Sequence, residues 1–150
     1  MKKSALLLTV LAVVTGALLT ACPGNPTTQA KASSLLLAQV TLRQQQIASP
    51  TQARLQEMQS YGMRTDNLGV QRVFIYLTRP LTTEQGNELR SLGLVLYPES
   101  WIPPVGNHPE GFMLADLPVD RLDSLAAKDY VVRLDTAERK SEPQSGSKPG

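Results

Sequence analysis

The chain has 150 residues, of which 41% are hydrophobic, 19% are charged and 5% are aromatic. This length suffices for one domain, which excludes a multidomain enzyme. A single cysteine excludes both an intramolecular disulfide framework and a zinc site that needs two or four cysteines. The formal net charge is +2, and Lys2 and Lys3 account for the whole excess of basic residues.

The first 21 residues have the layout of a secretory signal peptide. Two lysines precede an apolar run over residues 5–19, and small residues follow it up to Ala21. A membrane-spanning helix would need about 20 predominantly apolar residues. This run is shorter, contains threonines and a glycine, and stops before Pro23. We therefore predict a leader over residues 1–21 that is cleaved between Ala21 and Cys22.

The quartet Leu19, Thr20, Ala21 and Cys22 resembles the lipobox of bacterial lipoproteins. The resemblance implies that the Cys22 thiol receives a diacylglycerol and that the new amino terminus is often acylated too. Two or three acyl chains hold a protein stably on a bilayer, whereas one chain does so only reversibly. We expect a lipid-anchored protein of the cell envelope, with the outer membrane favoured because Pro23 replaces the aspartate typical of inner-membrane retention. A reactive Cys22 thiol, or an intermolecular disulfide, is the alternative that an odd cysteine leaves open.

Removal of the leader changes the charge balance. Without Lys2 and Lys3 the chain has 13 basic and 13 acidic side chains. A neutral chain has no electrostatic attraction to nucleic acid or to an anionic membrane surface. We expect no nucleic-acid partner.

Residues 22–69 are expected to connect the anchor to the folded domain. The composition of residues 23–32 is typical of a flexible tether. A helical segment over residues 35–61 follows, and within it Ser49 and Gln52 have the spacing of a capping box that starts a second helix.

From residue 70 the pattern alternates between strands and helices. The expected elements are a strand over 70–78, a helix between a Thr82/Gln85 capping box and Gly93, strands over 94–97 and 112–117, a helix from Pro118, and a strand over 130–134. This order predicts an α+β, ferredoxin-like split βαβ (βαββαβ) antiparallel sheet over residues 70–137, with two helices on one face. Residues 138–150 have the composition of a disordered tail.

Alternation along two of the strands divides their side chains between the two faces of the sheet. With Val73, Ile75 and Leu77 facing the helices, the helix-free face holds four apolar residues. They are Phe74, Tyr76, Phe112 and Leu114. An exposed apolar face of this kind usually marks a protein contact. The sequence is equally consistent with the helical segment 35–61 folding back to cover it.

The predicted loop over residues 99–110 holds a second candidate contact, Trp101 and Ile102, which could equally be a lid on the domain edge. His108, the one histidine, lies in the same loop with no nucleophile or metal ligands near it in sequence. Asp120 and Asp123 are explained by the favourable position of acidic residues at a helix start. We expect no enzymatic activity, no metal and no cofactor.

Several core positions resemble those of the inhibitor-type propeptide domains of bacterial subtilisin-like proteases. They include residues 73–77, Leu92 with Gly93, and residues 117–120. In that family the helix-free sheet face docks on the protease and the segment after the last strand occupies the active site. The resemblance implies that Phe74, Tyr76, Phe112 and Leu114 form the docking face and that residues 135–140 enter the cleft. No protease follows in this chain, so the resemblance implies an action in trans.

Together these patterns predict a non-catalytic envelope lipoprotein that presents a small protein-interaction domain, with inhibition of a subtilisin-like protease in trans as its most specific version. The alternative is a structural envelope lipoprotein that assembles with other envelope components. The expected partners are the membrane, through the lipid on Cys22, and another protein.

Overall fold

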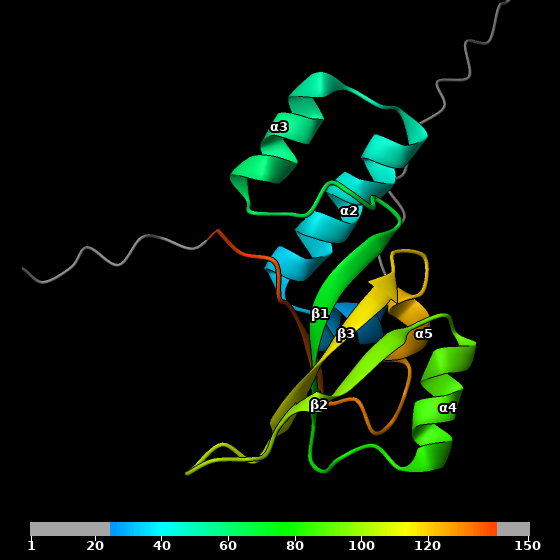
Figure 1. The fold of residues 1–150 in the computed structure, drawn as a ribbon, viewed down its shortest axis with the longest axis vertical. Helices are drawn as coiled ribbons and strands as arrows, with labels where there is room; N and C mark the ends of the chain where they lie inside the picture. The colour runs from blue at the N-terminus through cyan, green and yellow to red at the C-terminus, as the bar shows by residue number, and fades with distance from the viewer. Residues whose placement is uncertain (1–24, 141–150) are drawn as a thin grey trace, which may run out of the picture.

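The computed structural model describes residues 25–140. The helices and strands are α1 (Pro26–Lys31), α2 (Ser34–Ala48), α3 (Gln52–Ser60), β1 (Val70–Leu77), α4 (Thr83–Ser91), β2 (Val95–Ile102), β3 (Gly111–Pro118), α5 (Leu122–Ala126) and β4 (Arg133–Thr136). The four strands form one sheet in the order β2-β3-β1-β4, and every neighbouring pair is antiparallel (Figure 1). This is the strand order of the ferredoxin-like split βαβ fold, so the predicted fold class is confirmed.

Alternation along β1 and β3 fixes the two faces of the sheet. Val73, Ile75 and Leu77 are buried, whereas the residues between them are only half-buried. The register places Val73 opposite Ala115 and Ile75 opposite Met113, so the buried residues of both strands lie on one face. This face forms the core with α4 and α5, and α1 and α5 lie together behind the strands in Figure 1.

Helix α4 begins and ends where the sequence predicts. Thr82 Oγ1 accepts from Gln85 N at 3.2 Å, and Gln85 Oε1 accepts from Thr82 N at 3.0 Å, which completes the capping box. After the helix, Gly93 has φ +90°, a left-handed conformation that glycine adopts without strain. Helix α5 is shorter than expected: Pro118 ends β3, and the helix starts only at Leu122.

Strand β2 is longer than the predicted strand 94–97, because Pro98 does not end it. Proline is tolerated in a strand at the edge of a sheet, where its missing N–H is not needed for pairing. The pairing with β3 shifts register between Tyr97 and Ile102, and Leu114 N donates to Ser100 Oγ at 2.8 Å within the shifted stretch. Strand β4 begins later than the predicted 130–134, after a turn closed by Val131 N and Lys128 O.

The expectation of a flexible tether over residues 23–32 is wrong for the part that the structure describes. Residues 26–31 form α1, which packs on α5 through a hydrogen bond from Thr28 to Asp123. Lys31 Nζ donates to Lys128 O at 2.9 Å. Ala32 then forms a parallel bridge with Leu134, at the free edge of β4. Proline near its start and an asparagine cap make this polar segment a helix that tertiary contacts hold in place.

Helix α2 confirms the predicted helix from residue 35, and its Leu36 and Val40 join the buried cluster that contains Ile75 and Leu134. Helix α2 therefore packs on the same face of the sheet as α4 and α5, and α3 packs on α2. The segment 35–61 leaves the opposite face open. Helix α3 is capped by Thr51, whose Oγ1 accepts from Arg54 N at 3.2 Å, and not by the predicted Ser49/Gln52 pair.

The packed unit is larger than the predicted domain 70–137. It includes α1 and α2 on the N-terminal side and the buried Glu138 on the C-terminal side. The prediction of a disordered tail over residues 138–150 is wrong for Glu138, and residues 141–150 lie outside the described part of the chain.

Candidate functional site

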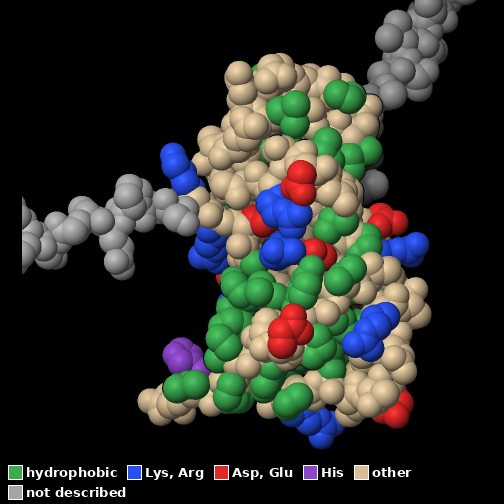
Figure 2. Space-filling model, viewed as in Figure 1, with side chains coloured by type: hydrophobic (Ala, Val, Ile, Leu, Met, Phe, Trp, Pro, Cys, Tyr) green, Lys and Arg blue, Asp and Glu red, His purple; other side chains and the backbone are tan. Residues whose placement is uncertain are grey.

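The helix-free face of the sheet, here called the open face, carries the four apolar residues that the sequence places there. Phe74, Tyr76, Phe112 and Leu114 are all half-buried, on the side of the sheet away from the core. The ring centroids of Phe74 and Phe112 are 5.2 Å apart in an edge-to-face arrangement, and those of Tyr76 and Phe112 are 5.4 Å apart. Aromatic pairs in such geometries attract one another beyond the effect of area burial. Figure 2 shows hydrophobic side chains gathered over the strands of this face.

An ion pair borders one end of this aromatic row. Arg72 donates to both carboxylate oxygens of Asp116, at 2.7 and 2.9 Å, and the two residues lie directly opposite each other in the β1–β3 register. Tyr97 Oη donates to Asp116 Oδ2 at 2.8 Å, and the Arg72 guanidinium lies 5.3 Å from the centroid of the Tyr97 ring. The hydrogen bond from Arg72 lowers the pKa of the Asp116 carboxyl below its usual value, with a smaller contribution from Tyr97. The pair is therefore charged on both sides near neutral pH.

A shallow pocket of about 280 Å³ borders the other end of the row. Its walls are Tyr76 and Phe112 from the sheet, Ile102 from the end of β2, and residues of the loop that follows, including His108. The Arg133 guanidinium lies 3.7 Å from the centroid of the Tyr76 ring, a cation–π contact. Nearly half of the Arg133 side chain is exposed at the rim of the pocket, where its Nε lies 3.9 Å from Glu110 Oε2 in an ion pair.

Trp101 and Ile102, predicted as neighbouring loop contacts, are both in β2 and serve opposite sides of the sheet. Trp101 is half-buried against the core, whereas Ile102 is 46% exposed and lines the open-face pocket. Alternation along an extended strand separates them. The structure therefore joins Ile102, but not Trp101, to the candidate binding face.

The polar residues of the open face were not predicted from the sequence. Arg72, Tyr97 and Arg133 surround the aromatic row, but only the strand register brings them to it. The one signal available in the sequence is the alternation of side chains along a strand. Arg72 is two residues from Phe74, and Asp116 is two residues from Leu114, so each pair lies on the same face of the sheet.

A cluster of buried polar residues, which the sequence also did not predict, lies where α2 meets β1 and the segment after β4. Arg43 on α2 is fully buried, and its Nη2 donates to Glu138 Oε2 at 2.6 Å. Glu138 also accepts from the backbone N–H groups of Arg64, at 2.8 Å, and Arg72, at 3.0 Å. Arg43 Nε donates to Gln71 Oε1 at 2.8 Å. Within residues 25–140, no buried side-chain nitrogen or oxygen lacks a hydrogen-bond partner.

This cluster corrects one expectation that followed from the propeptide resemblance. Residues 135–140 were expected to enter a protease cleft, but Asp135 and Thr136 are buried in β4 and Glu138 is buried against Arg43. Within the described chain only Arg139 and Lys140 are exposed after the last strand. A segment that enters a cleft would have to begin after Glu138.

The arrangement is suited to binding. Aromatic rings, a paired charge and an exposed guanidinium offer contacts to a partner surface. In residues 25–140 no group of three or more His, Cys, Asp or Glu side chains is placed to hold a metal ion. No helix in this part of the chain has the length and apolar character needed to cross a membrane. Ala21 and Cys22, the predicted cleavage and lipidation residues, lie outside the described residues.

Comparisons of the chain with protein-family models, with curated proteins and with solved structures gave no match. The fold and the open face therefore carry the functional argument alone.

Proposed function

We propose that this chain is a non-catalytic envelope lipoprotein whose small α+β domain binds another protein through the open face. The observation that carries the proposal is the half-buried aromatic row between the Arg72–Asp116 pair and the Ile102 pocket, on a sheet face that no helix of residues 25–140 covers. Aromatic residues and arginine are the side chains most enriched at protein interfaces.

The proposed lipid anchor would hold this domain close to the bilayer. The lipobox-like quartet places the lipid on Cys22, and the first capping residue of α1 is Asn25, three residues later. Three residues span at most about 11 Å. Because α1 packs on α5, the anchored domain would lie next to the membrane instead of at the end of a long tether.

Inhibition of a subtilisin-like protease in trans is the most specific version of this proposal. It rests on the resemblance of the core positions to inhibitor-type propeptides and on the open face, which is the docking face in that family. An inhibitory segment would consist of residues after Glu138.

A hydrolysis assay tests this version. The full chain is added to a subtilisin-type protease that is cleaving a chromogenic peptide. We expect inhibition, and we expect Tyr76→Glu and Leu114→Glu to weaken it at least tenfold, since each buries an unpaired charge in the interface. The control is Ile47→Glu, because Ile47 is 50% exposed on α2, away from the open face. Absence of inhibition, together with rapid digestion of the folded domain, would contradict the protease version.

One observation favours the alternative of a structural envelope lipoprotein. Helices α2 and α3 form a pair whose outer surface exposes Ile47 and, just after α3, Tyr61, which is 44% exposed. These are apolar contacts that an assembly with other envelope components could use.

Photo-crosslinking in cells separates the two functions. A photoreactive amino acid replaces Tyr76 in one full-length variant and Ile47 in another. The interaction function predicts a protein adduct at Tyr76 and none at Ile47, and the structural function predicts the reverse.

Lipidation is tested separately with Cys22→Ser. We expect the unaltered chain to remain in the membrane fraction after a high-salt wash and to incorporate labelled palmitate. The serine variant should do neither. Palmitate incorporation by the serine variant would contradict the assignment of Cys22.

A further inference from the structure

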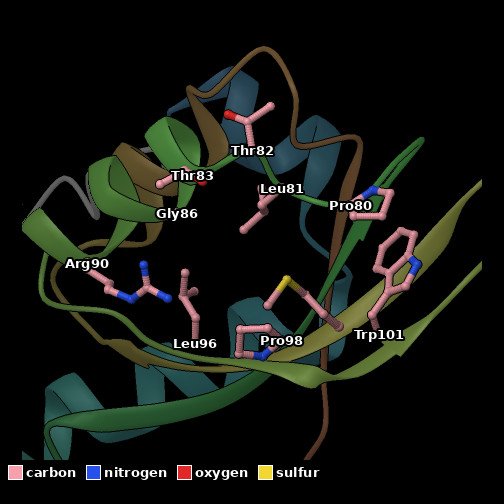
Figure 3. Close-up of a pocket in the computed structure, with 10 residues that line it drawn as sticks. Pro80, Leu81, Thr82, Thr83, Gly86, Arg90, Leu96, Pro98 and Trp101 are labelled. Carbon is pink, nitrogen blue, oxygen red and sulfur yellow. The ribbon is translucent and has the colours of Figure 1, made fainter.

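A second pocket lies on the core side of the sheet, between the start of α4 and the strands β2 and β3. We call it the α4 pocket. Its volume is about 280 Å³, just below the usual range of sites for drug-sized molecules in proteins, which suits a small ligand. Figure 3 shows the side chains that line it. They are Pro80, Leu81, Thr82, Thr83, Gly86, Arg90, Leu96, Pro98, Trp101 and Met113.

The floor of the α4 pocket is apolar. Leu96 from β2 and Met113 from β3 have the strand parity of the core, and Trp101 packs against the core cluster from the far end of β2. No residue that lines the pocket carries a negative charge. A ligand in this pocket would therefore place an apolar body against the sheet.

The hollow depends on a glycine. Gly86 is buried on the side of α4 that faces the pocket, although glycine in a helix is less favourable than alanine by about 1 kcal/mol. A Cβ at this position would lie 3.3 Å from Arg90 Nη1. The missing side chain keeps space open between the helix and the arginine.

Arg90 gives the pocket a charge. Its guanidinium lies at the opposite end of the pocket from Trp101, beside Leu96 (Figure 3). Nη1 donates to Asn87 Oδ1 at 3.3 Å, and no carboxylate of residues 25–140 lies within 4 Å of the Arg90 guanidinium. The same helix carries two acidic residues. Glu88 binds Lys128 at 2.5 Å and Tyr130 at 2.6 Å instead, and Glu84 forms no ion pair with any basic side chain of residues 25–140. Arg90 is thus free to bind an anion at the mouth of an apolar cavity.

We propose that the α4 pocket binds a small apolar monocarboxylate. The carboxylate accepts hydrogen bonds from the Arg90 guanidinium, a charge-assisted pairing that can be bidentate. The apolar body extends from there across Leu96 and Met113 towards Trp101. A volume of this size holds roughly ten non-hydrogen atoms, by comparison with the volume that one water molecule occupies in the liquid.

This site is independent of the open face. Met113 and Leu96 lie on the core side of their strands, whereas Phe112 and Tyr97 lie on the open side. The ligand and a protein partner could bind at the same time, and loss of one function need not affect the other.

Trp101 provides a direct readout, because it is the only tryptophan in the chain. The full chain, in a zwitterionic detergent at fixed concentration, is titrated with octanoate while the tryptophan emission is recorded. We expect a saturable change in the emission. Octanamide, which has the same shape without the charge, should bind about tenfold or more weakly, because hydrogen bonds between charged groups are the stronger ones. The methyl resonance of Met113 should shift with octanoate along the same saturation curve.

Two substitutions complete the test. Arg90→Gln should weaken octanoate binding about tenfold to a hundredfold, and it should abolish the preference over octanamide. Arg121→Gln removes the same charge from another exposed arginine, which does not line the pocket, and should bind octanoate like the unaltered chain. Both changes lie at exposed positions, so folding is preserved and is checked by circular dichroism.

Four results would overturn the proposal, and three of them concern the pocket directly. They are equal binding of octanoate and octanamide to the unaltered chain, unchanged octanoate binding in Arg90→Gln, and the absence of any saturable response of Trp101 and Met113. Loss of binding in Arg121→Gln to the same extent as in Arg90→Gln would also overturn it, since the effect would then reflect net charge and not the pocket.

Discussion

Gly111 begins β3 at a point where a side chain has no room. A Cβ there would lie 2.5 Å from Cη2 of Trp101, closer than such atoms approach in proteins, and would also meet the carbonyl oxygen of Ile102. The indole ring thus lies directly over the glycine. This contact turns Trp101 towards the core and leaves Ile102 on the opposite side, beside the open face.

Gly111→Ala should destabilise the domain by about 1–3 kcal/mol, because the added methyl group must displace the tryptophan ring or the backbone of β2. Urea unfolding followed by circular dichroism measures the loss, and the Trp101 emission should shift in the folded state. Gly69→Ala is the control, since a Cβ there meets only Asn67 Oδ1 at an ordinary 3.5 Å. Equal stability of the two variants would contradict the contact.

Asp116 makes the stability of the sheet depend on pH. Its folded-state pKa is lowered, chiefly by the hydrogen bond from Arg72. A carboxyl group with a lower pKa in the folded state stabilises folding above its unfolded pKa, which is about 4, and this contribution is lost as pH falls through the folded value. Because Arg72 is about one-third exposed, solvent screening reduces the contribution.

Asp116→Asn should therefore reduce stability at pH 7, and the difference from the unaltered chain should shrink as pH falls below about 4. Urea midpoints at pH 7, 4 and 2 test this. In an Arg72→Gln background the same substitution should show a much smaller pH dependence, because the cause of the lowered pKa is absent. A difference that is constant with pH would contradict the assignment.

Two helices show when local sequence signals decide where an element starts. The Thr82/Gln85 capping box of α4 forms as predicted, because both reciprocal hydrogen bonds are made within the segment itself. At the start of α3, Ser49 and Thr51 compete for the capping role, and Thr51 caps the helix. There Gln46 Oε1 accepts from Thr51 N at 3.0 Å, so a contact from α2 decides between two acceptable caps.

Thr82→Ala should destabilise the domain by about 1 kcal/mol, the usual effect of losing a side-chain cap. Thr83→Ala, at the first helical position, should change stability by less than about half as much, since Thr83 is exposed and does not cap the helix. Denaturant midpoints of the two variants give the comparison. If Thr83→Ala is as destabilising as Thr82→Ala, the capping box does not stabilise α4.

At the scale of the whole molecule, the two ends of the described chain close the core. Ala32 and Leu36 from the N-terminal helices pack into the cluster that contains Leu134, and Glu138 pairs with Arg43 in the interior. Gly62, with φ +74°, lies so close to the backbone of Arg139 that a Cβ there would be 2.6 Å from its carbonyl carbon. The fold is therefore a ferredoxin-like sheet that depends on segments outside its six standard elements.

Truncation tests this dependence. A chain that ends at Ala137 leaves Arg43 buried without its carboxylate and should lose about 3–5 kcal/mol of stability. A chain that ends at Lys140 keeps the pair and should unfold at the urea midpoint of the full chain. Arg43→Met in the shorter chain should restore part of the loss, because it removes the unpaired buried charge. Equal midpoints for the two truncations would show that Glu138 does not stabilise the fold.

The sequence by itself determined the parts of this protein that depend on short-range chemistry. The alternation of Val73, Ile75 and Leu77 with Phe74 and Tyr76 predicted both faces of β1, because side chains of a strand alternate whatever their surroundings. The order of strands and helices was enough for the fold class, since few topologies accommodate βαββαβ.

Only the tertiary structure decided what meets across the chain. The polar segment 26–31 has too weak a pattern to be recognised as part of the core, and Glu138 lies in a stretch whose composition predicts disorder. Both are ordered by contacts with residues about 100 positions away, Asp123 and Arg43. The open face and the α4 pocket also arise from such contacts. Strand register forms the open face, and the space left by Gly86 beside a floor that includes Trp101 forms the α4 pocket. Such contacts depend on the distance between atoms in space, which local patterns do not encode.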